Sequence, residues 1–260
     1  MKQKIPGWFV FHVPHDSTCI PDDVRHQFAL SDSELADEVL KMTDHHTLEL
    51  FTDGILARQI VRAEVSRLVV DVERFAEDNE EDMAKVGMGA VYKQTQSRSP
   101  LRHLLSVSDR NNLLNKWYYP HHEALTTNVD AALNEYGKCL VIDCHSFPSK
   151  PLPYEQAQSV DRPQFCIGTD RFHTPKQISK HLIDVLRQDG FTVKENSPFE
   201  GALVPQKFYQ QDKRVNAVMI EVRRDLYMNE DAGEKSSRFT DTALIVRRLL
   251  ANSHDFGGDI

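Results

Sequence analysis

Short apolar runs recur along this 260-residue chain, and longer stretches of alternating polar and apolar character separate them. The runs are rich in β-branched residues and have the length of buried strands rather than of helices. They predict strands at residues 8–13, 67–72, 138–144, 164–168 and 215–222.

The stretches between these runs carry helix signals. Helices are predicted at residues 31–42, 46–60, 109–136, 174–190 and 239–252. Ser31 followed by Glu34 is a capping box, and Thr174 and Gly190 bracket the fourth helix as N-cap and terminator. An interruption is expected near Pro120, because proline cannot donate a hydrogen bond inside a helix. The acidic segment 73–90 reads as an exposed loop.

Alternation of strands and helices predicts the α/β class, with a mostly parallel sheet that helices cover on both faces. No internal repeat or low-complexity linker divides the chain, so a single domain over residues 1–260 is expected.

Composition narrows the choice of partners and compartment. The net charge is −8, which argues against nucleic acid, because phosphate binding needs a basic face. No apolar run approaches the roughly 18 residues of a membrane span, and the N-terminal segment lacks a cleavage site, so a cytoplasmic protein without membrane contact is expected. The four cysteines form no C-x-x-C pair, and the oligomeric state stays open.

Polar side chains gather where the predicted strands end. They are His12 and His15, then Asp71, Glu73 and Arg74, then Asp143 and His145, and finally Glu221, Arg223 and Arg224. In a parallel sheet the carboxyl ends of the strands lie along one edge, and ligands bind there. We therefore expect these side chains to converge.

Two of the histidines suggest a metal. His15 and His145 each follow a strand, and imidazole suits zinc, whose catalytic sites take three protein ligands. Asp44 is the candidate for the third ligand, with His45 and His46 as rivals. The alternative is that both histidines only bond backbone groups at the starts of loops.

Glu221 ends an apolar strand, where a carboxylate is costly to bury unpaired. A glutamate whose pKa is raised by such a place can take a proton from water and return it to a leaving amine. The alternative is an ion pair with Arg223, Arg224 or Arg67 that only ties the sheet edge together.

Eight segments, in this order, resemble the N-formylglutamate amidohydrolase family: FHVPHDSTCIP, TDHHTLELF, VSRLVVDVERF, YYPHHEAL, LVIDCHSFPS, CIGTD, NSPFEGALVP and MIEVRRDLYM. The resemblance runs from about residue 9 to residue 228, and the family is similar in fold to the zinc carboxypeptidases and aspartoacylases. It implies a three-layer α/β/α sandwich of the phosphorylase/hydrolase type with a mixed, mostly parallel sheet. It also implies one zinc, with another divalent metal as an option, and hydrolysis of an N-acyl amino acid such as N-formyl-L-glutamate to formate and the free amino acid.

The resemblance also implies roles for single residues. It makes His15, Asp44 and His145 the metal ligands and Glu221 the general acid/base. The remaining candidates are Arg67 for catalysis and, for substrate binding, Arg74, His122, Ser146 and Arg223. The two arginines Arg67 and Arg74 suit a substrate carboxylate or a developing oxyanion.

The chain departs from the pattern at two positions. Thr18 stands where the carboxypeptidase relatives have a glutamate three residues after the first histidine, so the third ligand must come from elsewhere. Glu73 precedes Arg74 where much of the family has asparagine. A glutamate there is expected to repel a substrate carboxylate or to hold Arg74, which leaves the acyl group and the amino acid open.

Two alternatives come from other classes. Asp143-x-His145 suggests a two-metal, ureohydrolase-like enzyme, although no further metal-binding aspartate follows it. A catalytically inert binding protein on the same fold is the other alternative, and the complete set of His15, His145 and Glu221 argues against it.

Overall fold

Six strands form one sheet in the computed structural model, which describes residues 5–251. They are β1 (Phe9–Val13), β2 (Ile60–Arg62), β3 (Cys139–Phe147), β4 (Phe165–Gly168), β5 (Val193–Glu195) and β6 (Val215–Arg223). Their order is β2-β1-β3-β6-β4-β5, and every neighbouring pair is parallel except β4 and β6. The mostly parallel sheet of the α/β class is confirmed.

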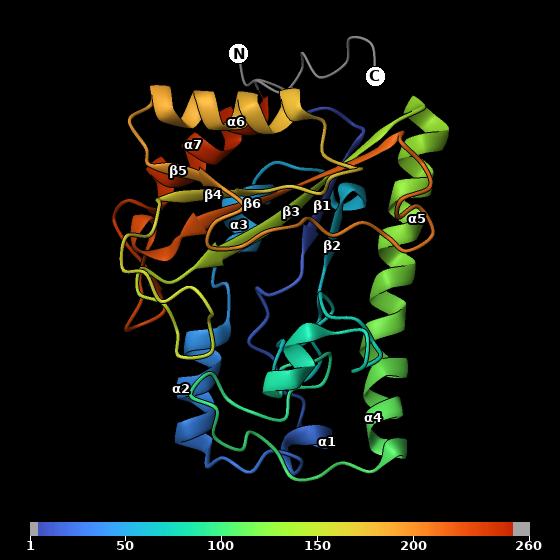
Figure 1. Ribbon diagram of the computed structural model, residues 1–260, viewed down its shortest axis with the longest axis vertical. Coiled ribbons are helices and arrows are strands. Elements are labelled where there is room, and N and C mark those ends of the chain that lie inside the picture. Colours follow the sequence, from blue (N-terminus) through green and yellow to red (C-terminus); the bar gives the residue numbers. More distant parts are fainter. Residues whose placement is uncertain (1–4, 252–260) are drawn as a thin grey trace.

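Helices cover both faces of this sheet (Figure 1). On one face lie α3 (Thr47–Thr52), α6 (Lys176–Gln188) and α7 (Phe239–Ala251), whose apolar side chains form one core with alternate residues of β1, β3, β4 and β6. On the other face α5 (Tyr119–Tyr136) packs Leu125 and Val129 against the intervening strand residues. The three layers agree with the predicted sandwich.

A second apolar core lies beyond the edge of the sheet, in the lower half of Figure 1. It joins α1 (Asp22–Arg25), α2 (Asp32–Met42) and α4 (Val107–Leu113) with the chain around η2 (Asp82–Val86). The stretch 73–90 is therefore only in part the exposed loop that its acidic composition predicts, since Met88 and Ala90 are buried in this core.

Two predicted elements are wrong. Residues 67–72 form a buried turn instead of a strand, because Leu68, Val69 and Val70 pack into the second core and the Ser66 carbonyl accepts the amides of Val69 and Val70. The helix predicted at 46–60 ends at Thr52. Gly54, with φ +75°, turns the chain into η1 (Ala57–Gln59) and β2.

The helix around Pro120 is continuous rather than interrupted. A π-helical turn, η3 (Leu114–Tyr118), joins α4 to α5 and changes the α-helical hydrogen-bond pattern directly before Pro120, the second residue of α5. In α6 the N-cap is Pro175 instead of the predicted Thr174, whose hydroxyl donates to the Ala217 carbonyl. The remaining short elements are η4 (Arg224–Leu226), β7 (Met228–Asn229) and β8 (Glu234–Lys235).

None of the helices within residues 5–251 has the length and apolar character that a membrane span requires.

The predicted capping box at the start of α2 is present. The Ser31 hydroxyl accepts the Glu34 amide at 3.4 Å, and the Glu34 carboxylate accepts the Ser31 amide at 2.8 Å. We expect Ser31→Ala to lower the free energy of unfolding by about 1 kcal/mol, because a free amide of the first turn loses its acceptor. Urea denaturation measures the change. Ser108→Ala, at an exposed position in the first turn of α4, is the matched control, and an equal loss there would show that the cap is not the cause.

Candidate functional site

The register of the three central strands places four titratable side chains on one face of the sheet. His12 of β1 is paired with Asp143 of β3, and His145 of β3 is paired with Glu221 of β6. Asp143 and His145 are two residues apart and therefore point to the same side. That side is the one that α5 covers, since Val141 and Ala217 of the same alternation pack against it.

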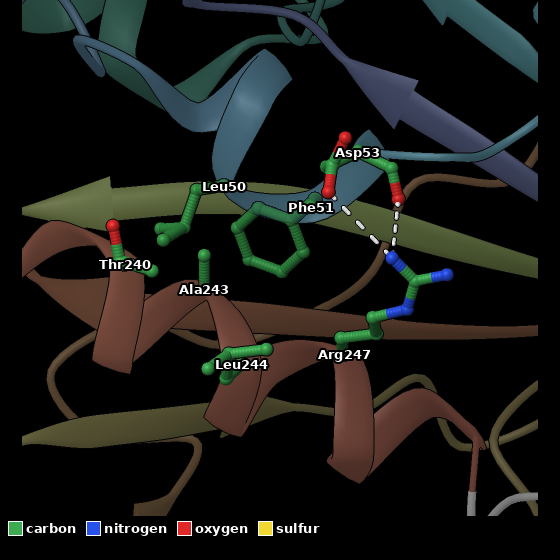
Figure 2. A pocket seen from close by; sticks show the side chains of 7 residues that line it. All are labelled: Leu50, Phe51, Asp53, Thr240, Ala243, Leu244 and Arg247. Atoms are coloured by element: carbon green, nitrogen blue, oxygen red, sulfur yellow. Dashed lines mark hydrogen bonds and ion pairs between the residues drawn. The ribbon is translucent and has the colours of Figure 1, made fainter. Parts of the chain in front are cut away.

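A hollow on the opposite side of the sheet is shown in Figure 2. It lies between α3 and α7 and is lined by Leu50, Phe51, Asp53, Thr240, Ala243, Leu244 and Arg247. Its only charged lining residues are Arg247 and Asp53, which pair with each other at 3.6 Å. No lining residue is a histidine or a cysteine, so this hollow offers neither the metal ligands nor the acid/base groups of the other face.

His15, Glu73 and His145 form a group that can hold a metal ion. One ligand atom from each of the three lies within 4.8 Å of the others. His15 follows β1, Glu73 follows the buried turn at 67–72, and His145 lies near the end of β3. A second group of the same kind, His12, Glu73 and Asp143, shares Glu73 with the first.

Each of the two histidines in the first group is held by an aspartate, and each aspartate is held by an arginine. The Nε2–H of His15 donates to Asp71 Oδ1 at 2.8 Å, and Arg67 donates to Asp71 Oδ2 at 2.9 Å. His145 Nδ1 lies 3.2 Å from Asp44 Oδ2, and Arg224 donates to Asp44 Oδ1 at 2.9 Å.

These contacts fix the two imidazole rings and leave specific atoms without partners. His15 Nδ1 and Glu73 Oε1 are buried and have no hydrogen-bond partner, although buried polar atoms normally have one. His145 Nε2 lies 3.1 Å from both Glu73 Oε2 and Asp143 Oδ1. The unpartnered atoms thus belong to the residues that form the first metal-binding group.

The charges of the site are unbalanced. Its carboxylates other than Glu221 are Asp44, Asp71, Glu73 and Asp143, and its guanidinium groups are Arg67, Arg74 and Arg224. Burial would lower the pKa of His145, but the charges of Glu73 and Asp143 hold it well above its usual value. The carboxylates therefore attract positive charge into the site, as a proton or as a metal cation.

His12 extends the site toward α5. Its Nδ1–H donates to Asp143 at 2.8 Å, and its Nε2 lies 2.8 Å from Nε2 of His121. Burial would lower the pKa of His12, but the adjacent carboxylates of Asp143 and Glu73 raise it to about 9. Burial and the adjacent His12 lower the pKa of His121 to about 2. A single proton therefore lies between the two Nε2 atoms, and His12 holds it.

Glu221 lies beside this group and is 6% exposed. Burial raises its pKa to about 8, and its Oε2 has no hydrogen-bond partner. The segment 197–204 passes over the sheet next to it: a β-carbon at Gly168 would collide with the Gly201 carbonyl, and the Leu203 amide donates to Asp143 at 3.0 Å. Close passage of this segment therefore requires glycine at position 168.

Most of the residues predicted from the sequence come together in the structure. The site contains His15, Asp44, His145, Glu221, Arg67 and Arg74. His122 lies at its edge, where its Nε2 donates to the Val72 carbonyl at 2.9 Å. Their chemical roles stay predictions.

Two residues predicted to contact the substrate, Ser146 and Arg223, are hydrogen-bonded to other protein groups. The Ser146 hydroxyl accepts from Arg224 Nε at 3.2 Å, and Ser146 is paired with Val222, whose side chain belongs to the core on the α7 side. The Arg223 guanidinium donates to Asp225 at 2.7 and 3.1 Å and to the Arg162 carbonyl at 2.7 Å. Neither side chain is brought to the metal-binding group.

Sequence reasoning missed the parts that His12, Asp71 and Glu73 play. All three belong to polar clusters at predicted strand ends, but only Glu73 was considered further, as a group acting on Arg74 or on a substrate. The available signal was period two along the strands, which places His12 with Asp143 and Asp143 with His145.

A model of the N-formylglutamate amidohydrolase family matches residues 8–228. N-formylglutamate deformylase of Pseudomonas putida is 24% identical over 225 residues, which cover 84% of this chain and 80% of that protein. The enzyme of the same name from Pseudomonas aeruginosa is 24% identical over 249 residues, which cover 92% and 89%.

Solved structures share the fold. The crystal structure of N-formylglutamate amidohydrolase from Ralstonia eutropha has a TM-score of 0.83 at 21% identity and covers 96% of this chain and 93% of its own. A gene product of Agrobacterium tumefaciens has a TM-score of 0.69 at 18% identity, with coverage of 98% and 93%. Because the family model matches most of its length, the chain belongs to the N-formylglutamate amidohydrolase family.

Proposed function

We propose that this protein hydrolyses the amide bond of N-formyl-L-glutamate to formate and L-glutamate, with one zinc ion held by His15, Glu73 and His145. Membership of the family supports the substrate class. The observation that carries the proposal is the group of His15, Glu73 and His145 beside the buried Glu221, whose Oε2 has no hydrogen-bond partner. An inert binding protein would gain nothing from these unsatisfied groups, which are costly to keep.

The residues fit a zinc ion. Two imidazoles and one carboxylate are a usual set of ligands in catalytic zinc sites. Two of the three residues, His15 and Glu73, each have a buried polar atom without a hydrogen-bond partner. When bound, zinc polarises the amide carbonyl and lowers the pKa of water. Asp44, the third ligand expected from the sequence, contacts His145 and Arg224 instead, and we assign it the orientation of His145.

Glu221 moves the proton. As a carboxylate it accepts a proton from the water that attacks the formyl carbon, and it then delivers that proton to the amide nitrogen as the carbon–nitrogen bond breaks. Its pKa of about 8 allows both protonation states near neutral pH.

We assign Arg74 to the α-carboxylate of the substrate. Its Nε is buried without a hydrogen-bond partner, and its side chain is 21% exposed, which leaves it reachable from outside. Arg67, by contrast, is engaged by Asp71 and Tyr92 and acts through Asp71 on His15.

One observation favours the two-metal alternative. The second group, His12, Glu73 and Asp143, shares Glu73 with the first, as a bridging carboxylate would. We favour one metal because His15 of the first group has a buried ring nitrogen without a hydrogen-bond partner, whereas both ring nitrogens of His12 in the second group are hydrogen-bonded, to Asp143 and to His121.

The ligand assignment predicts different metal affinities for two variants. Glu73→Gln removes a ligand and should leave well under one zinc per chain after dialysis. Asp44→Asn removes only an orienting contact and should weaken zinc binding by roughly 10–100-fold. Metal analysis and chelator competition measure both. One zinc in Glu73→Gln with none in Asp44→Asn would make Asp44 the ligand, and two zinc ions in the parent would favour the two-metal enzyme.

The proton-transfer role predicts the behaviour of Glu221→Gln. This change keeps the shape of the side chain and removes proton transfer, so kcat should fall by roughly 10²–10⁴-fold with zinc content unchanged. The assay follows amine release from N-formyl-L-glutamate, with N-acetyl-L-glutamate as a second substrate. Turnover at the parent rate by the variant would exclude the mechanism, and no turnover by the zinc-loaded parent would exclude the function.

The role of Arg74 predicts a change in KM. Arg74→Lys should raise the KM for N-formyl-L-glutamate roughly tenfold or more, because an ammonium group cannot reproduce a two-pronged contact to a carboxylate. N-formyl-4-aminobutyrate, which lacks the α-carboxylate, is the control substrate, and its KM should respond much less. An equal rise for both substrates would mean that Arg74 only supports Asp71.

A further inference from the structure

Arg162, in the loop before β4, carries buried donors with no acceptor. Its side chain is 2% exposed, and its Nη1 donates to Glu155 at 2.6 Å. Its Nε and Nη2 have no hydrogen-bond partner. Buried donors are normally satisfied, so an unpaired pair on a cation points to an acceptor that binds there.

The direction of β4 brings Arg162 to the edge of the sheet where the site lies. Because β4 runs antiparallel to β6, the start of β4 lies beside the carboxyl end of β6, with Phe165 paired to Val222. The Arg162 carbonyl accepts from Arg223 Nη1 at 2.7 Å, which fixes the backbone at this point.

The guanidinium group lies on the same face as His145 and Glu221. The register sets His145, Glu221 and Cys166 in one row across β3, β6 and β4. Arg162 lies over the ring of Phe147, at 5.0 Å, and Phe147 is two residues after His145 on that face. Burial raises the pKa of Cys166 at the end of this row, and the positive charge of Arg162 acts against that rise.

Aromatic rings shape the surroundings of this group. The guanidinium carbon lies 5.6 Å from the centre of the Phe199 ring as well as 5.0 Å from that of Phe147. The two phenyl rings lie 5.9 Å from each other and make favourable cation–π contacts with the guanidinium from the same side. Glu155 occupies one edge through Nη1, so the edge formed by Nε and Nη2 is the one left.

That edge is the one that binds carboxylates elsewhere in this chain. Arg223 uses Nε and Nη2 to hold both oxygens of Asp225, at 2.7 and 3.1 Å. Arg214 uses the same two nitrogens on Asp212, at 3.0 and 2.6 Å. A planar fork of two N–H groups matches the two oxygens of a carboxylate.

We propose that Arg162 binds the side-chain carboxylate of the acidic amino acid whose N-acyl amide is hydrolysed. The inference rests on the proposed function and adds the residue that selects the acidic side chain. The guanidinium of Arg162 lies over Phe147, two residues beyond His145 along β3, whereas Arg74 lies on the side of Asp71. The two arginines thus approach the metal-binding group from different sides, which assigns the side-chain carboxylate to Arg162 and the α-carboxylate to Arg74.

Glu155 makes the geometry of the fork decisive. Its carboxylate already neutralises the guanidinium charge, so a bound substrate is held by two directed hydrogen bonds more than by net charge. Lysine at this position would keep a cation for Glu155 but would lack the fork.

The test compares two substrates that differ only in the side-chain carboxylate, N-formyl-L-glutamate and N-formyl-L-glutamine. In the zinc-loaded parent, kcat/KM should be higher for the glutamate derivative. Arg162→Lys and Arg162→Met should each lower the ratio of the two kcat/KM values by roughly 10–100-fold, mainly through KM. Lys194→Met, which removes an exposed cation that contacts Asp161 in the same loop, should keep the parent ratio.

An equal loss on both substrates in Arg162→Lys would overturn the inference, because it would show that Arg162 only anchors the loop through Glu155. Should Arg162→Met fail to fold, Arg162→Lys decides alone, since it retains the pairing with Glu155.

Failure of the proposed function is distinguishable. If the parent hydrolyses neither substrate, calorimetric titration with glutarate and with its monoamide still tests the site. Tighter binding of glutarate in the parent and equal binding of the two in Arg162→Lys would support Arg162 as a carboxylate site, and equal binding in the parent would overturn it.

Discussion

The burial of several carboxylates at the ends of β1, β3 and β6 constrains everything around them. A buried carboxylate is stabilised when hydrogen-bond donors surround it. Two sets of side chains, each an arginine, an aspartate and a histidine, supply these donors here. They are Arg67, Asp71 and His15, and Arg224, Asp44 and His145. Although burial opposes it, pairing with His145 and Arg224 holds the pKa of Asp44 well below its usual range. Each arginine thereby keeps its aspartate ionised, and each ionised aspartate fixes one imidazole.

The sequence predicted the sheet well where strands are long and buried. β1, β3, β4 and β6 coincide with apolar runs, because residues buried on both faces leave a continuous apolar signal. β2 has only three residues at the edge of the sheet and leaves no such signal. The run at 67–72 imitates a strand, since the second core buries Leu68, Val69 and Val70 as completely as a sheet would. An apolar run thus predicts that a segment is buried, whereas tertiary packing determines whether its backbone forms a strand or a turn.

For the site, the sequence predicted the location at the ends of the strands but not the role of each residue there. His15 and His145 follow predicted strands and Glu221 lies at the end of one, so all three were predicted as site residues for that reason. Whether Glu73 or Asp44 completes a metal site depends on distances between segments that the chain order leaves free. Arg162 had no signal, because it precedes a strand, and in a parallel sheet such a residue would lie at the opposite edge. Only the reversed direction of β4 places it beside β6.

The π-helical turn between α4 and α5 carries one residue more than an α-helical turn would, so the helix beyond it is rotated by about 100° relative to a regular α-helix. Before the turn, Leu113 faces the second core, whereas beyond it His121 and His122 face His12 and the Val72 carbonyl. A chain one residue shorter between Leu113 and Pro120 would present only one of these two faces correctly. In an alignment of relatives, a single-residue gap at this place would therefore mark a difference in how the helix meets the site, even though the surrounding residues match.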